Sequence, residues 1–259
     1  IIASFQASAV SYLYYADRIY QINLAIAGIA ISTVILPKLS NLVVQQNSDG
    51  IKNIQNKALE LSLFLSFPAT IALLIASEPT ISSLFGYGSF SQTAVENSSK
   101  ALFYFAFGLP AFALIKVFSS FFFARHDTKI PFLISIFSVF TNILISLVFF
   151  QKIGFIILPI ATSISSWINA IFLYIFMRKK DLFEFNDLFK YRFPRIVFSS
   201  FCMGIILYLI LDMLALKIEY DQNFKVFYLL FTFLISLISY FLISYFIKAF
   251  KISDIKIRY

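Results

Sequence analysis

The 259-residue chain is 60% hydrophobic, contains 34 phenylalanines and has only 13% charged residues. A soluble globular domain does not have this composition, which is typical of polytopic membrane proteins. The net charge of +8 does not indicate nucleic-acid binding, because the basic residues flank apolar runs and form no stripe. With one cysteine and one histidine in the chain, an intrachain disulfide, a thiolate metal site and a histidine-based catalytic cluster are excluded.

Seven transmembrane helices are expected after a short helical stump at 1–5, because a span requires about 20 apolar residues. They are predicted at 10–39, 59–76, 101–123, 130–150, 154–177, 196–215 and 226–247. The first is longer than a bilayer requires, so it is tilted, extends into water or bends near Asn23 and Gly28. Pro68 predicts a kink in the second. The chain opens inside an apolar run without an initiator methionine, so we expect it to be a fragment of a longer protein.

The connections are predicted from their polar residues. A polar segment at 45–56 and a Ser- and Gly-bearing loop at 77–99, with a turn at 84–90, flank the second span. The segment 179–195 alternates charged residues with Leu and Phe at helical steps, which predicts a short helix in the membrane interface. A partner-binding role for that helix is the alternative.

The basic residues of the connections predict the orientation. Most of them lie on one side, which we therefore expect to be cytoplasmic and to carry the C-terminus. That side includes Lys251, Lys256 and Arg258. The opposite side has Lys100, Lys152, Lys217 and Lys225.

Asp17 and Arg18 place a carboxylate and a guanidinium inside the first predicted span. Charges at this depth are costly and normally face a bundle interior or a water-filled cavity. On a helix, the face of Arg18 also carries Ser11, Tyr14, Tyr15, Gln21 and Ala25. The guanidinium fork matches two phosphate oxygens, so this stripe suits an anionic, hydroxyl-rich ligand. A structural Asp17–Arg18 ion pair is the alternative, although successive residues point about 100° apart.

Two further groups of polar residues lie inside predicted spans. Lys116 either contributes to the same cavity or extends to the headgroups by snorkelling. Asn142, Ser146 and Thr162 lie on two antiparallel spans joined by a short turn, so their oxygens could converge on a cation. Sodium or proton coupling through them is one interpretation, and hydrogen bonding between the helices is the other.

Several motifs resemble those of one transporter family. They are Tyr14-Tyr15-Ala16-Asp17-Arg18-Ile19-Tyr20-Gln21, the segment 28–40, Gly108-Leu109-Pro110, Lys116-Val117 and the segment 122–131 with Ala124-Arg125-His126-Asp127-Thr128-Lys129. Together they closely resemble the MurJ/MviN family of lipid II flippases, of the MOP exporter superfamily. Beyond about residue 135 the resemblance is one of hydropathy and loop placement.

The resemblance implies an all-α fold. The chain would be the C-terminal lobe of a two-lobe, MATE-like transporter plus two extra C-terminal helices that form a groove for the lipid tail. The domains would be residues 1–178 for the lobe, 179–195 for a cytoplasmic interfacial linker, and 196–259 for the added helices and tail.

The resemblance also implies the site. Arg18 matches an arginine that lines the family's central cavity, and Ser11, Asp17 and Gln21 match polar positions beside it. The sequence departs from the family pattern at Asn23, where Pro is usual, at Ala25, where Gly is frequent, and at Tyr87, where Arg is common. It also has Ser146 where members with a proposed cation site have Asp, which weakens sodium coupling.

The implied function is translocation of an undecaprenyl-diphosphate-linked peptidoglycan precursor to the outer leaflet of the bacterial cytoplasmic membrane by alternating access. Its partners would be lipid II, membrane lipids and the missing N-terminal lobe, with no cofactor and no catalytic step. Three alternatives are an exporter of another polyprenyl-linked glycan or of organic cations, a membrane-embedded glycosyl or acyl transferase, and a nonfunctional remnant or scaffold. An organic cation would be bound by Asp17 with Tyr14 and Tyr15. The transferase would need a positioned acid or base, and usually a metal, for which the sequence has no motif.

Overall fold

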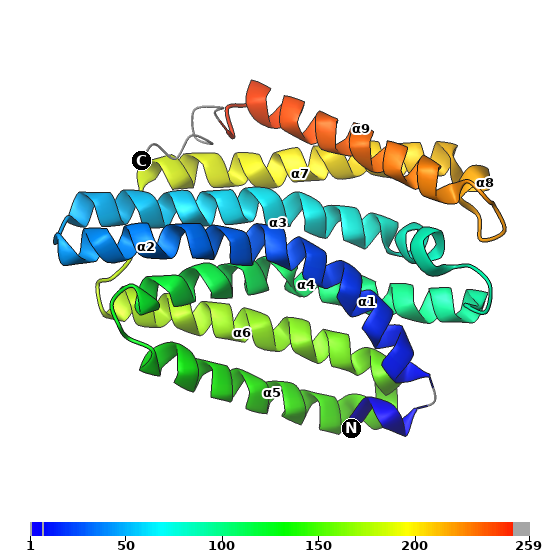
Figure 1. Ribbon diagram of the computed structural model, residues 1–259, viewed down its shortest axis with the longest axis horizontal. Coiled ribbons are helices and arrows are strands. Elements are labelled where there is room, and N and C mark those ends of the chain that lie inside the picture. Colours follow the sequence, from blue (N-terminus) through cyan, green and yellow to red (C-terminus); the bar gives the residue numbers. More distant parts are fainter. Residues whose placement is uncertain (1, 7, 251–259) are drawn as a thin grey trace.

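The long helix predicted at 10–39 is bent, which is one of the three explanations that the sequence analysis gave for its length. The computed structural model describes residues 2–6 and 8–250. After a 3₁₀ turn at Ile2–Phe5, α1 (Ala9–Leu24) passes through a π-helical turn at Ala25–Ile29 into α2 (Ala30–Val44). Such a turn inserts extra backbone and bends a helix, and Figure 1 shows α1 leaving the direction of α2 at this point. The bend therefore forms although Asn23 and Ala25 replace the family's usual Pro and Gly.

The next two helices are longer than predicted. They are α3 (Ser48–Phe85) and α4 (Gln92–Phe123). The side chains of Asn47 and Ser91 accept hydrogen bonds from Gly50 N and Ala94 N, as helix caps do. Much of the expected connections at 45–56 and 77–99 is therefore helical. The turn predicted at 84–90 largely coincides with the connection at 86–91.

The sequence predicted a kink at Pro68, but the kink in α3 lies elsewhere. The backbone leaves the helical region at Ala76, with φ −110° and ψ 22°. Ala76 is three residues before Pro79, whose ring and missing N–H interrupt the helix. Pro68 and Pro79 both lie inside α3, and the kink is associated with Pro79, which is nearer the helix end.

A helical hairpin and a C-terminal pair complete the fold. Helix α5 (Lys129–Ile153) turns back at Gly154, where φ is 72°, through a 3₁₀ turn (Gly154–Ile156) into α6 (Ile157–Lys179). Then follow α7 (Asp187–Met213), the single turn α8 (Ala215–Ile218) and α9 (Lys225–Phe246). The expected separate interfacial helix at 179–195 is not formed, because residues 187–195 are the first turns of α7 and residues 180–186 are not helical.

Within the described residues, six helical stretches are long and apolar enough to cross a membrane. One of them, 129–179, contains the antiparallel helices α5 and α6 (Figure 1). Each of the seven expected spans therefore coincides with a helix. The connections at 45–47, 124–128 and 180–186 share one end of the bundle, called the basic end here, and those at 86–91 and 214–224 share the opposite end (Figure 1).

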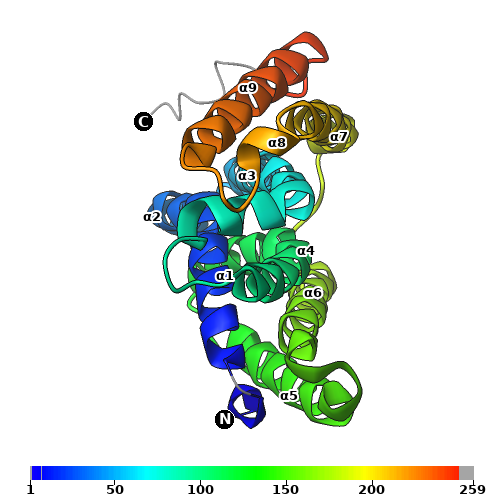
Figure 2. The same ribbon diagram turned by 90° about the vertical axis from the view of Figure 1, so that its right-hand side faces the viewer.

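The helices are arranged in layers around α3 and α4. Figure 2 shows α7 and α9 on one side of α3, and α6 followed by α5 on the side of α4. Near the basic end the buried side chains include Leu39, Phe121, Phe122, Met177 and Phe183. Toward the opposite end they include Ala16, Tyr20, Leu102 and Leu109. The bent helix α1–α2 lies across both groups, so one of its faces is packed and the other is exposed.

Candidate functional site: a polar stripe beside an apolar groove

The exposed face of α1 carries the predicted polar stripe. Ser11, Tyr14, Arg18 and Gln21 are exposed, and Asp17 is half-buried beside them. Arg18 Nη2 donates a hydrogen bond to the Tyr14 hydroxyl at 2.9 Å, and its Cζ lies 4.6 Å from the centre of the Tyr14 ring. This contact holds the guanidinium on the open face while most of its donors stay available.

Asp17 and Arg18 do not pair with each other. Asp17 accepts a hydrogen bond from Gln21 Nε2, one turn along the same helix. Among the ion pairs of the described residues none includes Arg18. The angular separation of successive helical residues explains this, and the structural ion pair that the sequence left open is absent from the described part of the chain.

Tyr15 does not contribute its ring to this stripe. Its ring centre lies 4.8 Å from that of Phe85 and 4.9 Å from that of Phe90. The side chain therefore packs against the connection between α3 and α4. It links the site helix to that connection.

Lys116 is exposed on α4, beside the π-helical turn. Its backbone oxygen accepts a hydrogen bond from Ser32 Oγ at 3.1 Å. A Cβ placed on Gly28 would lie 3.2 Å from Ala113 Cα and 3.4 Å from Lys116 Cγ, so the absence of a side chain at Gly28 permits this approach. Gly28 is ten residues after Arg18, so the two cations are about 15 Å apart along the helix axis.

The three residues considered for cation coupling lie between α5 and α6. Asn142 Nδ2 donates to Thr162 Oγ1 at 3.1 Å and to Ser165 Oγ at 3.3 Å. Ser146 is fully buried, and its hydroxyl has no hydrogen-bond partner within the described structure. The hydrogen bonding between helices that the sequence offered as one interpretation is thus present, and cation coupling stays a prediction.

An apolar groove runs along the other flank of α1. It has a volume of about 390 Å³ and is bordered by α1, α3, α7 and α9. Ile19 and Asn23 contribute from α1, Phe64 and Pro68 from α3, and Tyr240 from α9. The Tyr240 hydroxyl donates to Phe64 O at 2.7 Å, which fixes α9 against α3. Because Ile19 follows Arg18 directly, one helix separates the polar stripe from the groove.

A family comparison agrees with this arrangement. Residues 1–230 match the model of the family described as lipid II flippase MurJ. The chain belongs to the MurJ family.

Individual MurJ relatives show the same similarity. A probable lipid II flippase MurJ of Rhizobium meliloti is 37% identical over 218 residues, covering 84% of this chain and 41% of that protein. The Rickettsia prowazekii protein of the same description is 35% identical over 209 residues, covering 81% and 41%. The chain thus spans less than half the length of these relatives.

A solved MurJ structure has the same fold. The lipid II flippase MurJ in an inward closed conformation superposes with a TM-score of 0.78 at 27% identity, covering 95% of this chain and 49% of that one. The all-α transporter fold predicted from the sequence is therefore confirmed. The match also confirms that the chain corresponds to about half of a MurJ protein.

Three charged side chains are buried that the sequence analysis did not predict to be buried. Arg192 Nη1 lies 2.5 Å from Glu60 Oε1, and both residues are buried. Lys225, assigned from sequence to an aqueous connection, is 0% exposed. Glu60 is the second residue of the span predicted at 59–76, and a carboxylate there could have indicated a buried charge. The burial of Lys225 depends on contacts between residues far apart in the chain, which the sequence does not reveal.

Proposed function

We propose that this chain is half of a lipid II flippase and carries one wall of its transport cavity. The observation that supports this most directly is the division of α1 into two flanks. Arg18 presents a cation on the exposed flank, and Ile19 borders an apolar groove on the other. A lipid with a diphosphate and sugars at one end and a long hydrocarbon chain at the other matches this pairing of surfaces.

The headgroup would be held by the polar stripe. Arg18 offers two parallel N–H donors to phosphate oxygens, and its hydrogen bond to Tyr14 fixes it beforehand. Ser11 and Gln21 are exposed on the same face and suit sugar hydroxyls. Lys116 adds a second cation about 15 Å farther along the axis, within reach of the other end of an extended headgroup.

The hydrocarbon chain would remain in the apolar groove. The groove's residues from α7 and α9 include Met203, Phe233 and Leu237. A polyprenyl chain can contact these apolar side chains without the free-energy penalty of burying polar groups. The headgroup can then cross through the polar cavity while the tail stays in an apolar environment.

Alternating access would come from movement of this lobe against the other half of the protein. The π-helical turn at Ala25–Ile29 lies between the stripe and the basic end, and such turns frequently occur at functional sites. A ligand shifts the conformational equilibrium only through different affinity for the two states. The phosphate contact with Arg18 must therefore change between them.

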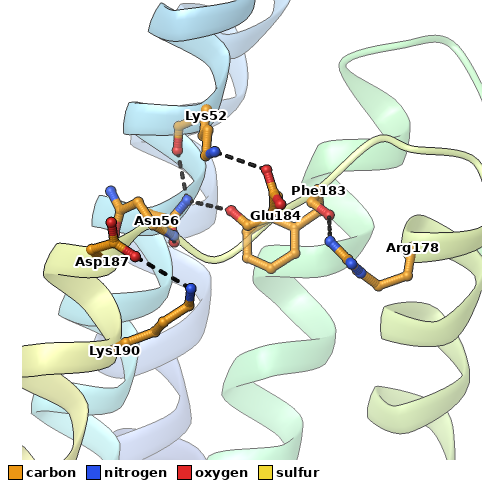
Figure 3. Close-up of polar contacts among 8 residues, drawn as sticks. Lys52, Asn56, Arg178, Phe183, Glu184, Asp187 and Lys190 are labelled. Carbon is orange, nitrogen blue, oxygen red and sulfur yellow. Dashed lines mark hydrogen bonds and ion pairs between the residues drawn. The ribbon is translucent and has the colours of Figure 1, made fainter.

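The location would be the bacterial cytoplasmic membrane with the basic end inside. Lys52, Arg125 and Arg178 line one pocket at that end, and Lys190 lies near Lys52 (Figure 3), as the positive-inside rule requires of a cytoplasmic face. The C-terminal lysines and arginine on which this orientation also relied lie outside the described residues.

The organic-cation alternative is less well supported by the side chains. That site needs a carboxylate and aromatic rings facing the same cation. Asp17 is instead hydrogen-bonded to Gln21, and the Tyr15 ring packs against Phe85 and Phe90. The arrangement leaves a guanidinium as the available charge, which favours an anionic ligand.

A vesicle assay tests this proposal. The complete protein that carries this chain is reconstituted with labelled lipid II, and the label that reaches the opposite leaflet is measured for wild type, Arg18→Gln and Lys179→Gln. We expect Arg18→Gln to lose transport and Lys179→Gln, which removes an exposed charge at the end of α6, to keep it. Undiminished transport by Arg18→Gln would refute the assigned role.

A further inference from the structure

A second polar pocket lies at the basic end, far from the stripe. It has a volume of about 430 Å³ and is formed by the start of α3, the end of α6, the α4–α5 connection and the α6–α7 connection. Its cationic side chains are Lys52, Arg125 and Arg178. Figure 3 shows the surroundings of Lys52 and Arg178 on either side of the connection that carries Phe183 and Glu184.

The backbone around this pocket is firmly held. Gln55 Nε2 donates to Leu182 O at 3.1 Å, and Asn56 Nδ2 donates to Glu184 O at 2.9 Å (Figure 3). Asn56 Oδ1 also accepts from Asn186 N at 3.0 Å. The α6–α7 connection is thus fixed to α3, so the pocket wall is preformed.

Both arginines are fixed by the same connection. Arg125 donates to Phe121 O at 2.8 Å and to Leu182 O at 3.3 Å. Arg178 Nη1 donates to Phe183 O at 3.2 Å. Since each guanidinium has five N–H donors in a rigid fork, both keep donors for a ligand while their positions are set.

The charges of the pocket are only partly compensated. Lys52 Nζ pairs with Glu184 Oε2 at 2.8 Å, and outside the pocket lining Lys180 Nζ pairs with Asp127 Oδ2 at 2.8 Å. Asp181 also lines the pocket, but in the described part of the chain neither Arg125 nor Arg178 forms an ion pair. Burial lowers the pKa of the Arg125 guanidinium, as expected for a cation withdrawn from water without a carboxylate.

We propose that this pocket binds a phosphoryl group between Arg125 and Arg178. Arginine forks recognise phosphate oxygens through paired hydrogen bonds, and Lys52 lies at the same pocket. The site is distinct from the proposed transport cavity. Arg125, which belongs to the 122–131 motif, would bind the ligand there. The phosphoryl group would come either from an anionic lipid of the adjoining leaflet or from a soluble phosphate compound.

The binding test uses the complete protein in nanodiscs, in an Arg18→Gln background so that the proposed cavity arginine does not contribute. The ligand-induced rise in unfolding temperature is measured with inorganic diphosphate in phosphatidylcholine, and separately on adding phosphatidylglycerol to the discs. We expect the double variant R125Q/R178Q to bind at least about tenfold more weakly, as loss of charge-assisted hydrogen bonds predicts. Because the comparison does not involve transport, it stands if the flippase proposal fails.

Three control variants sharpen the result. Lys179→Gln removes the neighbouring charge, which does not line the pocket, and should bind as the parent does. Arg178→Lys keeps the charge and should retain part of the affinity. Glu184→Gln should bind more tightly, because it removes a competing carboxylate and frees Lys52.

The outcomes decide between the sources. A shift with diphosphate in neutral discs supports a soluble phosphate compound, and a shift with phosphatidylglycerol alone supports a lipid headgroup. Equal shifts in the parent and R125Q/R178Q, or an equal loss in Lys179→Gln, would overturn the proposal.

Discussion

Arg192 Nη1 lies 2.5 Å from Glu60 Oε1 and joins α7 to α3 with both side chains almost completely buried. Removing one partner takes a charge-assisted hydrogen bond away from a buried ion, so Glu60→Gln and Arg192→Met should each destabilise the protein by about 1.5–3 kcal/mol. The double variant should lose much less than the sum of the two. Thermal unfolding in one detergent measures the cycle, and additive losses would show that the pair is not coupled.

Lys225 fastens the start of α9 to the α3–α4 connection. Its amine donates to Gly86 O at 2.8 Å and to Tyr220 O at 2.6 Å. Lys225→Met should remove both bonds and destabilise this end by about 1–3 kcal/mol. Hydrogen exchange at 86–91 and 219–224 should become faster than in wild type. Lys217→Met, which changes an exposed lysine of the same hairpin, should leave exchange at 86–91 unchanged, and an equal effect of both variants would contradict the assigned contact.

Gly28 allows α4 to approach the π-helical turn. A Cβ there would lie 3.2 Å from Ala113 Cα and 3.3 Å from Leu24 Cδ1, and a branched side chain has no room. Gly28→Val should therefore destabilise the protein by about 1–3 kcal/mol. Ala25→Val, on the exposed face of the same turn, is the control and should unfold near the wild-type temperature. A wild-type midpoint for Gly28→Val would disprove close packing at this site.

Asp127 supports a pH-dependent contact at the basic end. The hydrogen bond from Lys180 is the main reason that the pKa of its carboxyl is lowered. Because this pKa is lowered in the folded protein, the ionised Asp127 carboxyl stabilises the fold at pH values above its unfolded-state pKa of about 3.9. That stabilisation is lost as the pH falls through the folded-state pKa. The difference in stability between wild type and Asp127→Asn should therefore shrink between pH 6 and pH 3. A difference that stays constant over this interval would exclude the ion pair as its source.

The sequence predicted the polar stripe well because a helix fixes which residues share a face. Ser11, Tyr14, Arg18 and Gln21 are all exposed along α1, as their spacing indicated. Tyr15 lies about 100° from Tyr14, at the edge of that face. Its rotation toward Phe85 and Phe90 depends on a connection some 70 residues later, which periodicity does not reveal.

Helix ends were predicted less well than helix cores. Apolar length marks the part of a helix in the membrane, but α3 continues beyond it at both ends. Asn47 and Ser91 are capping residues whose positions were readable from sequence. The kink at Ala76 required a choice between Pro68 and Pro79, and local sequence does not determine it.

We propose that the complete protein moves lipid II to the outer leaflet, and depletion of this protein in cells is the decisive test. Lipid II exposed on the outer face of the cytoplasmic membrane is labelled from outside, and total lipid II is measured in parallel. We expect outer-leaflet lipid II to disappear while total lipid II is maintained, and wild type but not Arg18→Gln to restore it. Unchanged outside labelling after depletion would refute lipid II transport, and the stripe and groove would then serve another amphipathic substrate.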